Sequence, residues 1–315
     1  MNSIAVAVLS RSFSKHVSLR GELLARYERV TFNDEGRALA GEELIAFLRG
    51  HDKAITGLER LDARVFDAVP ELRVVSKYGV GLDTLDVRAM QARGVKLGWT
   101  PGVNRRSVAE LVVSASIALL HRTPAATREL LDGRWRQVVG RQLTGRTVGI
   151  VGCGHIGKEV ALLMRAFGCR VLAHDICEYV SFYAAHQVQA LPLDALLREA
   201  DVITLHLPLD ASTWHMFGAV RLDLLKPDSI FINMARGGLV DELALKQQLQ
   251  DGRLAGAALD VFETEPRPDR ELLALPNVLA TPHIGGSAEE AILAMGRAAI
   301  AGLEAAQLPE RLGIL

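Results

Sequence analysis

Short apolar segments alternate with amphipathic stretches along most of this chain. Helical spacing separates most of the apolar segments, as at Leu44, Ile45 and Leu48. Alternation of this kind is typical of an α/β fold with parallel sheets. The predicted strands are 4–9, 54–57, 74–76 and 95–97 in a first series, and 147–151, 170–174, 202–206, 229–233, 255–259 and 278–280 in a second.

Two long alanine-rich segments adjoin the second series. Ser107 stands three residues before Glu110, which is the spacing of a capping box and predicts a helix from Ser107 to about Leu120. That segment is apolar nearly all round, so we expect it to be buried and able to join two domains. A second long helix is expected from Gly286 to about Ala306.

Composition narrows the class of protein. The chain has 315 residues, of which 49% are hydrophobic and 23% charged, so about two well-packed domains are expected. The net charge of −1 lacks the basic excess of a nucleic-acid-binding protein. Three cysteines without paired spacing predict neither a disulfide framework nor a metal site. No apolar run is long enough to span a bilayer, so a cytoplasmic protein without a membrane partner is expected.

The strongest local motif is a glycine-rich turn. Gly152, Gly154 and Gly157 directly follow an apolar strand and open a helical pattern. This arrangement lets a pyrophosphate approach the backbone at a helix N-terminus. Asp175 ends the next strand, where a carboxylate can bind the ribose hydroxyls of NAD and repel the 2′-phosphate of NADP. The alternative is a glycine turn used only for packing.

Three further segments carry candidate chemistry at strand ends. Arg236 precedes two glycines and can bind a carboxylate through two parallel hydrogen bonds. His283 can take the proton from a hydroxyl as hydride leaves the carbon. A carboxylate such as Glu265 on the other ring nitrogen would fix the tautomer. Taken singly, each is also compatible with a surface or core residue.

Together these segments resemble the D-isomer-specific 2-hydroxyacid dehydrogenase family. The resemblance covers about residues 73–294. The matching segments, in order, are Ser76-Lys77-Tyr78-Gly79-Val80-Gly81-Leu82-Asp83, Thr100-Pro101-Gly102-Val103-Asn104, the glycine motif, Met234-Ala235-Arg236-Gly237-Gly238, Asp260-Val261-Phe262 with Glu265-Pro266, and Thr281-Pro282-His283-Ile284-Gly285-Gly286. Six segments in one order are far more specific than any one of them.

The resemblance implies the role of each matching residue. His283 would be the acid/base, Glu265 its partner and Arg236 the substrate anchor, while the backbone amides of Val80 and Gly81 would hold the substrate carboxylate. The other implied substrate residues are Lys77, Tyr78, Gly79 and Arg105. Asp260 would contact the nicotinamide carboxamide. The other implied cofactor residues are His155, Ile156, His206, Pro208, Thr213, Ala235 and Gly285.

The resemblance also implies an architecture. It predicts a doubly wound, parallel-sheet NAD domain at 101–285, inserted in a smaller flavodoxin-like substrate domain made of 1–100 and 286–315. The site would lie in the cleft between these domains, the two long helices would be crossovers, and the protein would be a homodimer. The expected activity is NAD-dependent hydride transfer on a small 2-oxo or 2-hydroxy acid.

These motifs are compatible with more than one 2-oxo acid substrate. Lys77, Arg105, Arg106 and Arg60 would suit a substrate with a second anionic group, such as a phosphate, phosphonate or carboxylate. The segment 104–111 also resembles 3-phosphoglycerate dehydrogenases, in a short form without their regulatory extension. Surface placement of these cations is the alternative. Trp99 and Trp214 could line a pocket or simply pack.

Two other functions remain compatible with this scaffold. Phosphite or formate dehydrogenases share it, although formate enzymes of this kind usually pair the histidine with glutamine rather than with a residue like Glu265. A non-enzymatic NAD-sensing protein could keep all three catalytic groups. Turnover of a 2-oxo acid with NADH distinguishes the enzyme from the sensor.

Overall fold

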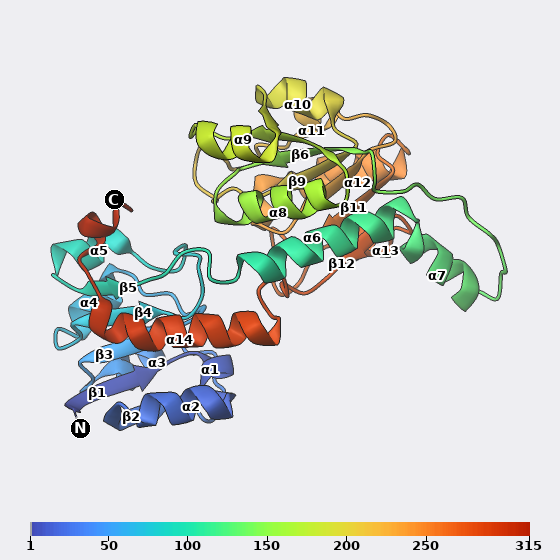
Figure 1. Cartoon of the computed structure of the whole chain (residues 1–315). Helices are drawn as coiled ribbons and strands as arrows, with labels where there is room; N and C mark the ends of the chain where they lie inside the picture. The colour runs from blue at the N-terminus through green and yellow to red at the C-terminus, as the bar shows by residue number, and fades with distance from the viewer. Residues whose placement is uncertain (1) are drawn as a thin grey trace. The chain divides into compact units, whose positions relative to one another are not determined.

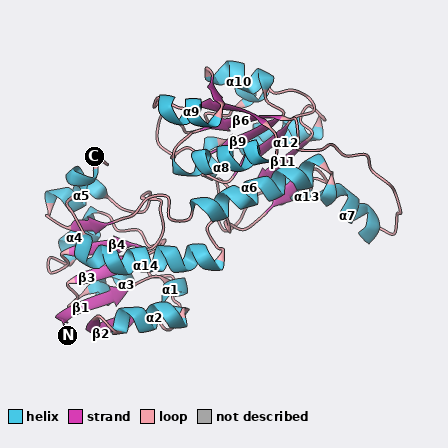
Figure 2. Ribbon diagram, viewed as in Figure 1, coloured by secondary structure: helices cyan, strands magenta, loops and turns pink. Residues whose placement is uncertain are grey.

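The computed structural model describes residues 2–315, which form two compact units (Figures 1 and 2). Unit 1 contains the chain up to Asn104 together with Glu289–Leu315. Unit 2 contains Arg105–Ala288. Among the described residues, no helix is both long and apolar enough to cross a membrane.

Unit 1 is built on a five-stranded parallel sheet with strand order β2-β1-β3-β4-β5, the order of flavodoxin-like folds. Its strands are β1 (Asn2–Val8), β2 (Tyr27–Phe32), β3 (Lys53–Thr56), β4 (Val74–Lys77) and β5 (Lys96–Gly98). Its helices are α1 (Arg11–Lys15), α2 (Val17–Leu24), α3 (Gly41–Leu48), α4 (Ala63–Ala68), α5 (Val87–Ala92), α14 (Glu289–Ala305) and the 3-10 helix η2 (Pro309–Leu312).

Helices cover both faces of this sheet. Successive side chains of a strand point to opposite faces, and here the side chains on both faces are apolar and pack against helices. On β1, Val6 and Val8 pack in one apolar cluster with residues of α2 and α14, whereas Ala7 packs in another with residues of α3, α4 and α5. A Cβ atom on Gly98 would lie 2.3 Å from the carbonyl oxygen of Gly302, so β5 and α14 touch through their backbones.

Unit 2 has a seven-stranded parallel sheet in the order β12-β11-β10-β9-β6-β7-β8. Its strands are β6 (Thr147–Val151), β7 (Arg170–His174), β8 (Val188–Ala190), β9 (Val202–Leu205), β10 (Ile230–Asn233), β11 (Gly256–Leu259) and β12 (Val278–Ala280). Its helices are α6 (Arg105–Leu120), α7 (Thr123–Leu131), α8 (His155–Ala166), α9 (Val180–His186), α10 (Leu193–Glu199), α11 (Ala219–Leu222), α12 (Glu242–Gln250), α13 (Arg270–Ala274) and the 3-10 helix η1 (Gly237–Leu239).

The strand order reverses direction between β6 and its neighbour β9, since the chain runs from β6 outward to β7 and β8 before it returns to β9. Ligands of open parallel sheets bind outside the carboxyl ends of the strands at such a reversal. The order therefore places the expected cofactor site beside the ends of β6 and β9.

The predicted α/β class with parallel sheets is confirmed, and β6, β7 and β12 have the predicted bounds. Strands β2 and β8 were not predicted. β2 is an edge strand whose side chains are mostly exposed or half-buried, and β8 is three residues long with only Val188 buried. Neither strand has the apolar run by which the others were found.

The predicted capping box at Ser107 is wrong. Helix α6 begins at Arg105, so Ser107 lies inside its first turn. The Ser107 hydroxyl donates to the carbonyl oxygen of Gly285 at 2.6 Å, and it accepts a hydrogen bond from the backbone N–H of Ala288 at 3.4 Å. A tertiary contact with the segment 281–288 therefore uses the group that the local pattern assigned to a cap.

Candidate active site

The glycine turn lies between β6 and α8. Gly152 has φ +91°, and a Cβ atom on it would lie 2.5 Å from the carbonyl oxygen of His206. A Cβ atom on Gly157 would lie 2.1 Å from the carbonyl oxygen of Gly152. A Cβ atom on Gly154, in contrast, would have no heavy atom within 4 Å. The first and third glycines thus permit close packing, and the second leaves open space at the start of α8.

Asp175 follows β7 and is oriented by two backbone amides. Its Oδ2 accepts a hydrogen bond from the N–H of Cys153 at 2.6 Å, and its Oδ1 accepts one from the N–H of Cys177 at 2.8 Å. The first of these bonds fixes the carboxylate beside the glycine turn. A carboxylate in this place has lone pairs left to accept from ribose hydroxyls.

His206, directly after β9, is held as a neutral ring. Its Nε2 lies 3.0 Å from the Thr204 hydroxyl, and its buried Nδ1 has no hydrogen-bond partner among the described residues. Burial lowers the pKa of His206 to about 3, because the charged ring would lose its hydration. In the following loop, the Thr213 hydroxyl donates to the carbonyl oxygen of Pro208 at 2.9 Å.

These residues fit a dinucleotide. The first-turn amides of α8, at His155 and Ile156, have no helical carbonyl to bind and carry the positive end of the helix dipole. Open space at Gly154 leaves room for a pyrophosphate, and Asp175 stands where the adenosine ribose would lie. NAD would be held by these groups.

Arg236 is placed by a buried asparagine at the end of β10. The Asn233 Oδ1 accepts from the N–H of Ala235 at 3.1 Å, and its Nδ2 donates to the carbonyl oxygen of Arg236 at 2.8 Å. A Cβ atom on Gly237 would lie 1.9 Å from the carbonyl carbon of Phe262, so the Arg236 loop and the loop after β11 touch through their backbones. Asn233 was not predicted, although a polar residue at the end of an apolar strand was a usable signal.

His283 and Glu265 form the predicted pair. The distance from His283 Nδ1 to Glu265 Oε2 is 2.9 Å, and Glu265 Oε1 accepts from the N–H of Phe262 at 3.0 Å. Both side chains are partly exposed, His283 at 46% and Glu265 at 39%. Since Nδ1 donates to the carboxylate, Nε2 is the ring atom left for a substrate.

Asp260 holds the segment that carries His283. Its carboxylate is buried and accepts three hydrogen bonds, from the Thr281 hydroxyl at 2.6 Å, from the N–H of Ile284 at 2.7 Å and from the N–H of Gly285 at 2.7 Å. Its backbone carbonyl accepts from the N–H of His283 at 2.8 Å. His283 itself has φ +55°, an unfavourable value that this network sustains. The hydrogen bond from the Thr281 hydroxyl to Asp260 was not predicted.

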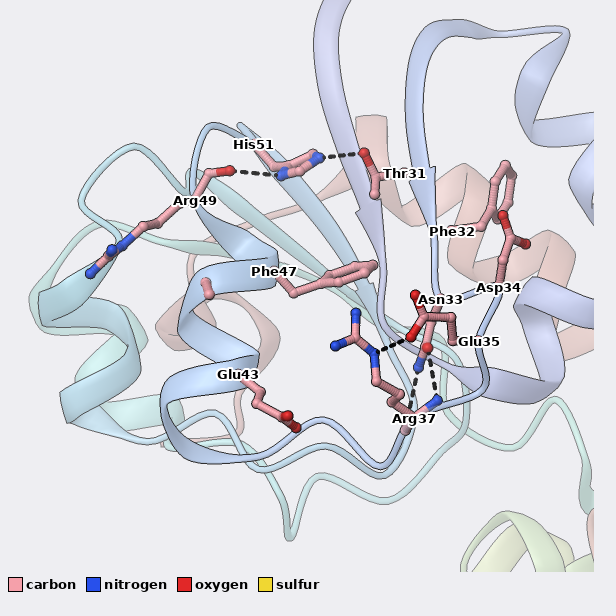
Figure 3. Close-up of a pocket in the computed structure, with 11 residues that line it drawn as sticks. Thr31, Phe32, Asn33, Asp34, Glu35, Arg37, Glu43, Phe47, Arg49 and His51 are labelled. Atoms are coloured by element: carbon pink, nitrogen blue, oxygen red, sulfur yellow. Dashed lines mark hydrogen bonds and ion pairs between the residues drawn. The ribbon is translucent and has the colours of Figure 1, made fainter.

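A mostly apolar cavity of about 340 Å³ adjoins the histidine–glutamate pair within unit 2. Its wall includes His283, Glu265, Pro266 and Leu273. A larger cavity of about 630 Å³ lies in unit 1 between β2, α3 and the loop that joins them (Figure 3). That cavity contains none of the predicted site residues, so its size does not mark it as the reaction site.

The predicted substrate loop of unit 1 follows β4. Lys77 is buried, and its ammonium group donates to the Gly57 carbonyl and, at 3.2 Å, to the Thr84 hydroxyl. Tyr78 packs edge-to-face on Phe13 with ring centroids 5.5 Å apart, and burial raises its pKa. Gly79, at φ +132°, turns the chain into Val80 and Gly81 in a conformation that favours glycine.

The arginines at the start of α6 form ion pairs within unit 2. Arg105 Nε lies 3.3 Å from Glu159 Oε2, and Arg106 Nε lies 3.2 Å from Glu159 Oε1. Glu159 is on α8, so these pairs join the two helices. Among residues 2–315, no group of three or more histidine, cysteine or acidic side chains is arranged to hold a metal ion.

Comparisons with known proteins identify the family of this chain. The family model of the D-isomer specific 2-hydroxyacid dehydrogenase NAD binding domain matches residues 113–285. A glyoxylate reductase from Korarchaeum cryptofilum is 40% identical over 237 residues, which cover 73% of this chain and 71% of that protein. A D-3-phosphoglycerate dehydrogenase from Rattus norvegicus is 40% identical over 82% of this chain, but this chain spans only 49% of its length.

Among solved structures, a putative D-isomer specific 2-hydroxyacid dehydrogenase from Polaromonas sp. superposes with a TM-score of 0.88 at 27% identity, covering 96% of each chain. The fold, the glycine turn and the sequence similarity therefore all indicate the same family. This chain belongs to the D-isomer specific 2-hydroxyacid dehydrogenase family, and it is an NAD-dependent oxidoreductase of 2-oxo and 2-hydroxy acids.

Proposed function

We propose that this enzyme reduces a small 2-oxo acid with a single carboxylate, of the size of glyoxylate or hydroxypyruvate, to the 2-hydroxy acid. The observation that carries the proposal is the His283–Glu265 pair, 2.9 Å apart, in the same unit as the glycine turn and Arg236. The likeness to a glyoxylate reductase supports the same substrate class.

The pair provides the proton of the reaction. The cofactor supplies the hydride to the carbonyl carbon when it is bound. His283 Nε2 donates a proton to the carbonyl oxygen, and the Glu265 carboxylate stabilises the charged ring through Nδ1. In the oxidative direction the same nitrogen takes the hydroxyl proton back. The 281–285 segment, held by Asp260, keeps the ring in place for both directions.

The substrate carboxylate needs hydrogen-bond donors that hold it in place. We propose that Arg236 binds the substrate carboxylate, and that the backbone amides of Val80 and Gly81 bind it as well. A guanidinium matches the planar carboxylate and orients the carbonyl relative to His283. Asn233 fixes the backbone on either side of Arg236, which limits the directions its side chain can take.

The preference for one carboxylate follows from the partners of two cations that were expected to bind substrate, Lys77 and Arg105. Lys77 donates to the Gly57 carbonyl and the Thr84 hydroxyl, and Arg105 pairs with Glu159. A second anionic group on the substrate would have to compete with these internal partners. Lys77 would then attract the substrate anion through its positive charge at the start of the loop, without contacting the substrate directly.

The test measures the rate at which NADH absorbance falls when each of a panel of 2-oxo acids is added. Glyoxylate and hydroxypyruvate should be reduced, and 3-phosphohydroxypyruvate should have the lower kcat/KM. Arg236→Ala should raise KM for these acids, with Arg253→Ala, which removes an exposed ion pair with Asp223, as the matched control. Preferential use of the phosphorylated acid would transfer the assignment to a dianionic substrate. Absence of turnover with every acid would favour an NAD-sensing protein instead.

We also propose a homodimer in the cytoplasm. Helix α7 has no buried residue, and the segment after it exposes Trp135 at 87% and Val139 at 86%. In Figure 1, α7 and this segment extend away from the rest of unit 2. Apolar side chains so exposed favour burial against a second copy. Light scattering after gel filtration gives the mass, and a monomer at micromolar concentration would contradict the proposal.

A further inference from the structure

The loop that follows β4 is held by a tryptophan from the end of β5. The indole Nε1 of Trp99 donates a hydrogen bond to the carbonyl oxygen of Val80 at 2.9 Å. Both residues belong to unit 1, so this contact lies within one compact unit. Val80 is one of the two residues whose amides are proposed to bind the substrate carboxylate.

Strand register brings these residues together. In the parallel pair of β4 and β5, Ser76 is opposite Gly98, so Trp99 lies beside the first residues of the loop after β4. The close backbone contact of Gly98 with Gly302 fixes the end of β5. The Trp99 ring is half-buried and packs against the apolar cluster of unit 1 that contains Leu97 and Leu85. This packing fixes the orientation of the indole N–H relative to the Val80 carbonyl.

The bonded carbonyl and the amide of Gly81 belong to the same peptide group. That peptide is trans, since the one cis bond among the described residues joins Glu265 to Pro266. In a trans peptide the C=O and N–H bonds point in opposite directions. Because the Val80 carbonyl points at Trp99, the Gly81 N–H must point away from it.

The two amides of the loop are available to a ligand. Within residues 2–315, neither the Val80 N–H nor the Gly81 N–H donates to another group of the chain. Gly79, Val80 and Gly81 are only partly buried. In a turn, successive backbone N–H groups can form a concave site that suits an anion. A carbonyl that accepts a hydrogen bond also makes the N–H of its own peptide a stronger donor.

We propose that Trp99 is a positioning residue for the substrate carboxylate: its indole N–H orients the Val80–Gly81 peptide and strengthens the Gly81 N–H as a donor. This inference rests on the proposed function, in which that amide binds the carboxylate of a 2-oxo acid. Trp99 touches neither the substrate nor the reacting atoms, and its effect passes through one peptide group. It should therefore act on substrate binding and leave proton transfer at His283 unchanged.

The first test is Trp99→Phe, which keeps a ring and removes the donor. KM for glyoxylate should rise about fivefold, as expected for the loss of one net hydrogen bond, while kcat changes less than twofold. The dissociation constant for NADH should stay unchanged. Tyr27→Phe is the matched control, because it removes another aromatic donor of unit 1, the hydroxyl that bonds Glu304 at 3.3 Å, and it should leave KM unchanged.

A second variant separates the N–H from the packing of the ring. The benzothiophene analogue of tryptophan at position 99 keeps both rings and replaces the N–H by sulfur. It should reproduce the rise in KM with an unchanged thermal midpoint. Wild-type KM in this variant, or a fall in kcat equal to the rise in KM, overturns the role of Trp99.

Failure of the inference and failure of the proposed function give different results. If Arg236→Ala raises KM and His283→Ala lowers kcat while both variants at position 99 behave as wild type, the proposed function stands and the inference fails. If wild-type enzyme reduces no 2-oxo acid, the proposed function fails and the inference fails with it.

Discussion

The carboxylate of Asp260 offers the sharpest test of how the site is held, through the substitution Asp260→Asn. The side chain is 1% exposed and accepts hydrogen bonds from Thr281, Ile284 and Gly285. Asparagine has nearly the same shape but one acceptor atom fewer. If its oxygen keeps the bonds to Thr281 and Ile284, its NH₂ group faces the N–H of Gly285.

The cost follows from that geometry. One charge-assisted hydrogen bond is lost and a buried N–H is left unsatisfied, which costs about 1.5–3 kcal/mol. The two remaining bonds lose their ionic partner and weaken by roughly half. At the lower ends of these ranges the total is about 3 kcal/mol of unfolding free energy. For a unit of this size that corresponds to roughly 6–12 °C in the midpoint of the thermal transition.

The same substitution should lower activity, because the released segment carries His283. Loss of its support should displace the imidazole and reduce kcat about tenfold or more. NADH affinity should fall less, since the glycine turn and Asp175 are not touched. The measurements are the thermal midpoint by circular dichroism, steady-state kinetics with glyoxylate, and NADH binding by fluorescence.

The control is Asp241→Asn. Asp241 caps α12 by accepting from the N–H groups of Leu243 and Ala244, and asparagine is an equally good cap. Its thermal midpoint and kcat should match wild type. A midpoint for Asp260→Asn within 2 °C of wild type, together with an unchanged kcat, would refute the view that this carboxylate holds the catalytic segment.

Three further predictions follow from single side chains. His283→Ala should lower kcat by at least a hundredfold and leave NADH affinity within about threefold; equal losses in both would remove the acid/base role. Asp175→Ala should narrow the preference for NADH over NADPH, measured as the ratio of kcat/KM values, and an unchanged ratio would exclude Asp175 as the selector. The pKa of His206 is about 3 in the folded protein and about 6.5 in the unfolded chain. Between these two pH values, His206 binds a proton only when the chain is unfolded. The contribution of His206 to stability should therefore fall by about 1.4 kcal/mol per pH unit as the pH is lowered through this range, so His206→Gln should lose stability less steeply than wild type; parallel losses would contradict the neutral ring.

Much of the fold was predictable from local pattern. Buried parallel strands are apolar runs bounded by polar or glycine residues, so β6, β7 and β12 were located to the residue. The glycine motif was informative because Gly152 and Gly157 meet steric requirements that the sequence context already indicated, as their close contacts show. Edge strand β2 was missed because half its surface faces solvent and its side chains need not be apolar.

Side-chain partners distant in the sequence were not predictable in the same way. Ser107 and Glu110 satisfy a local capping rule, yet the Ser107 hydroxyl bonds Gly285, 178 residues away. Lys77 and Arg105 were expected to suit a substrate anion, and their internal partners Gly57 and Glu159 were not predicted. Short-range rules describe what a residue can do, and the neighbours supplied by the fold decide which of these possibilities is used.

The sequence by itself determined the two parallel sheets, the cofactor turn and the identities of Arg236, Glu265 and His283, since these depend on residue type, spacing and order along the chain. Only the tertiary structure decided that Asp260 binds the 281–285 segment, that the Nδ1 atom of His206 is buried, and that Trp99 bonds the Val80 carbonyl. Each of these depends on the distance between atoms on different loops. Strand register and backbone packing set those distances, and no local pattern in the sequence encodes them.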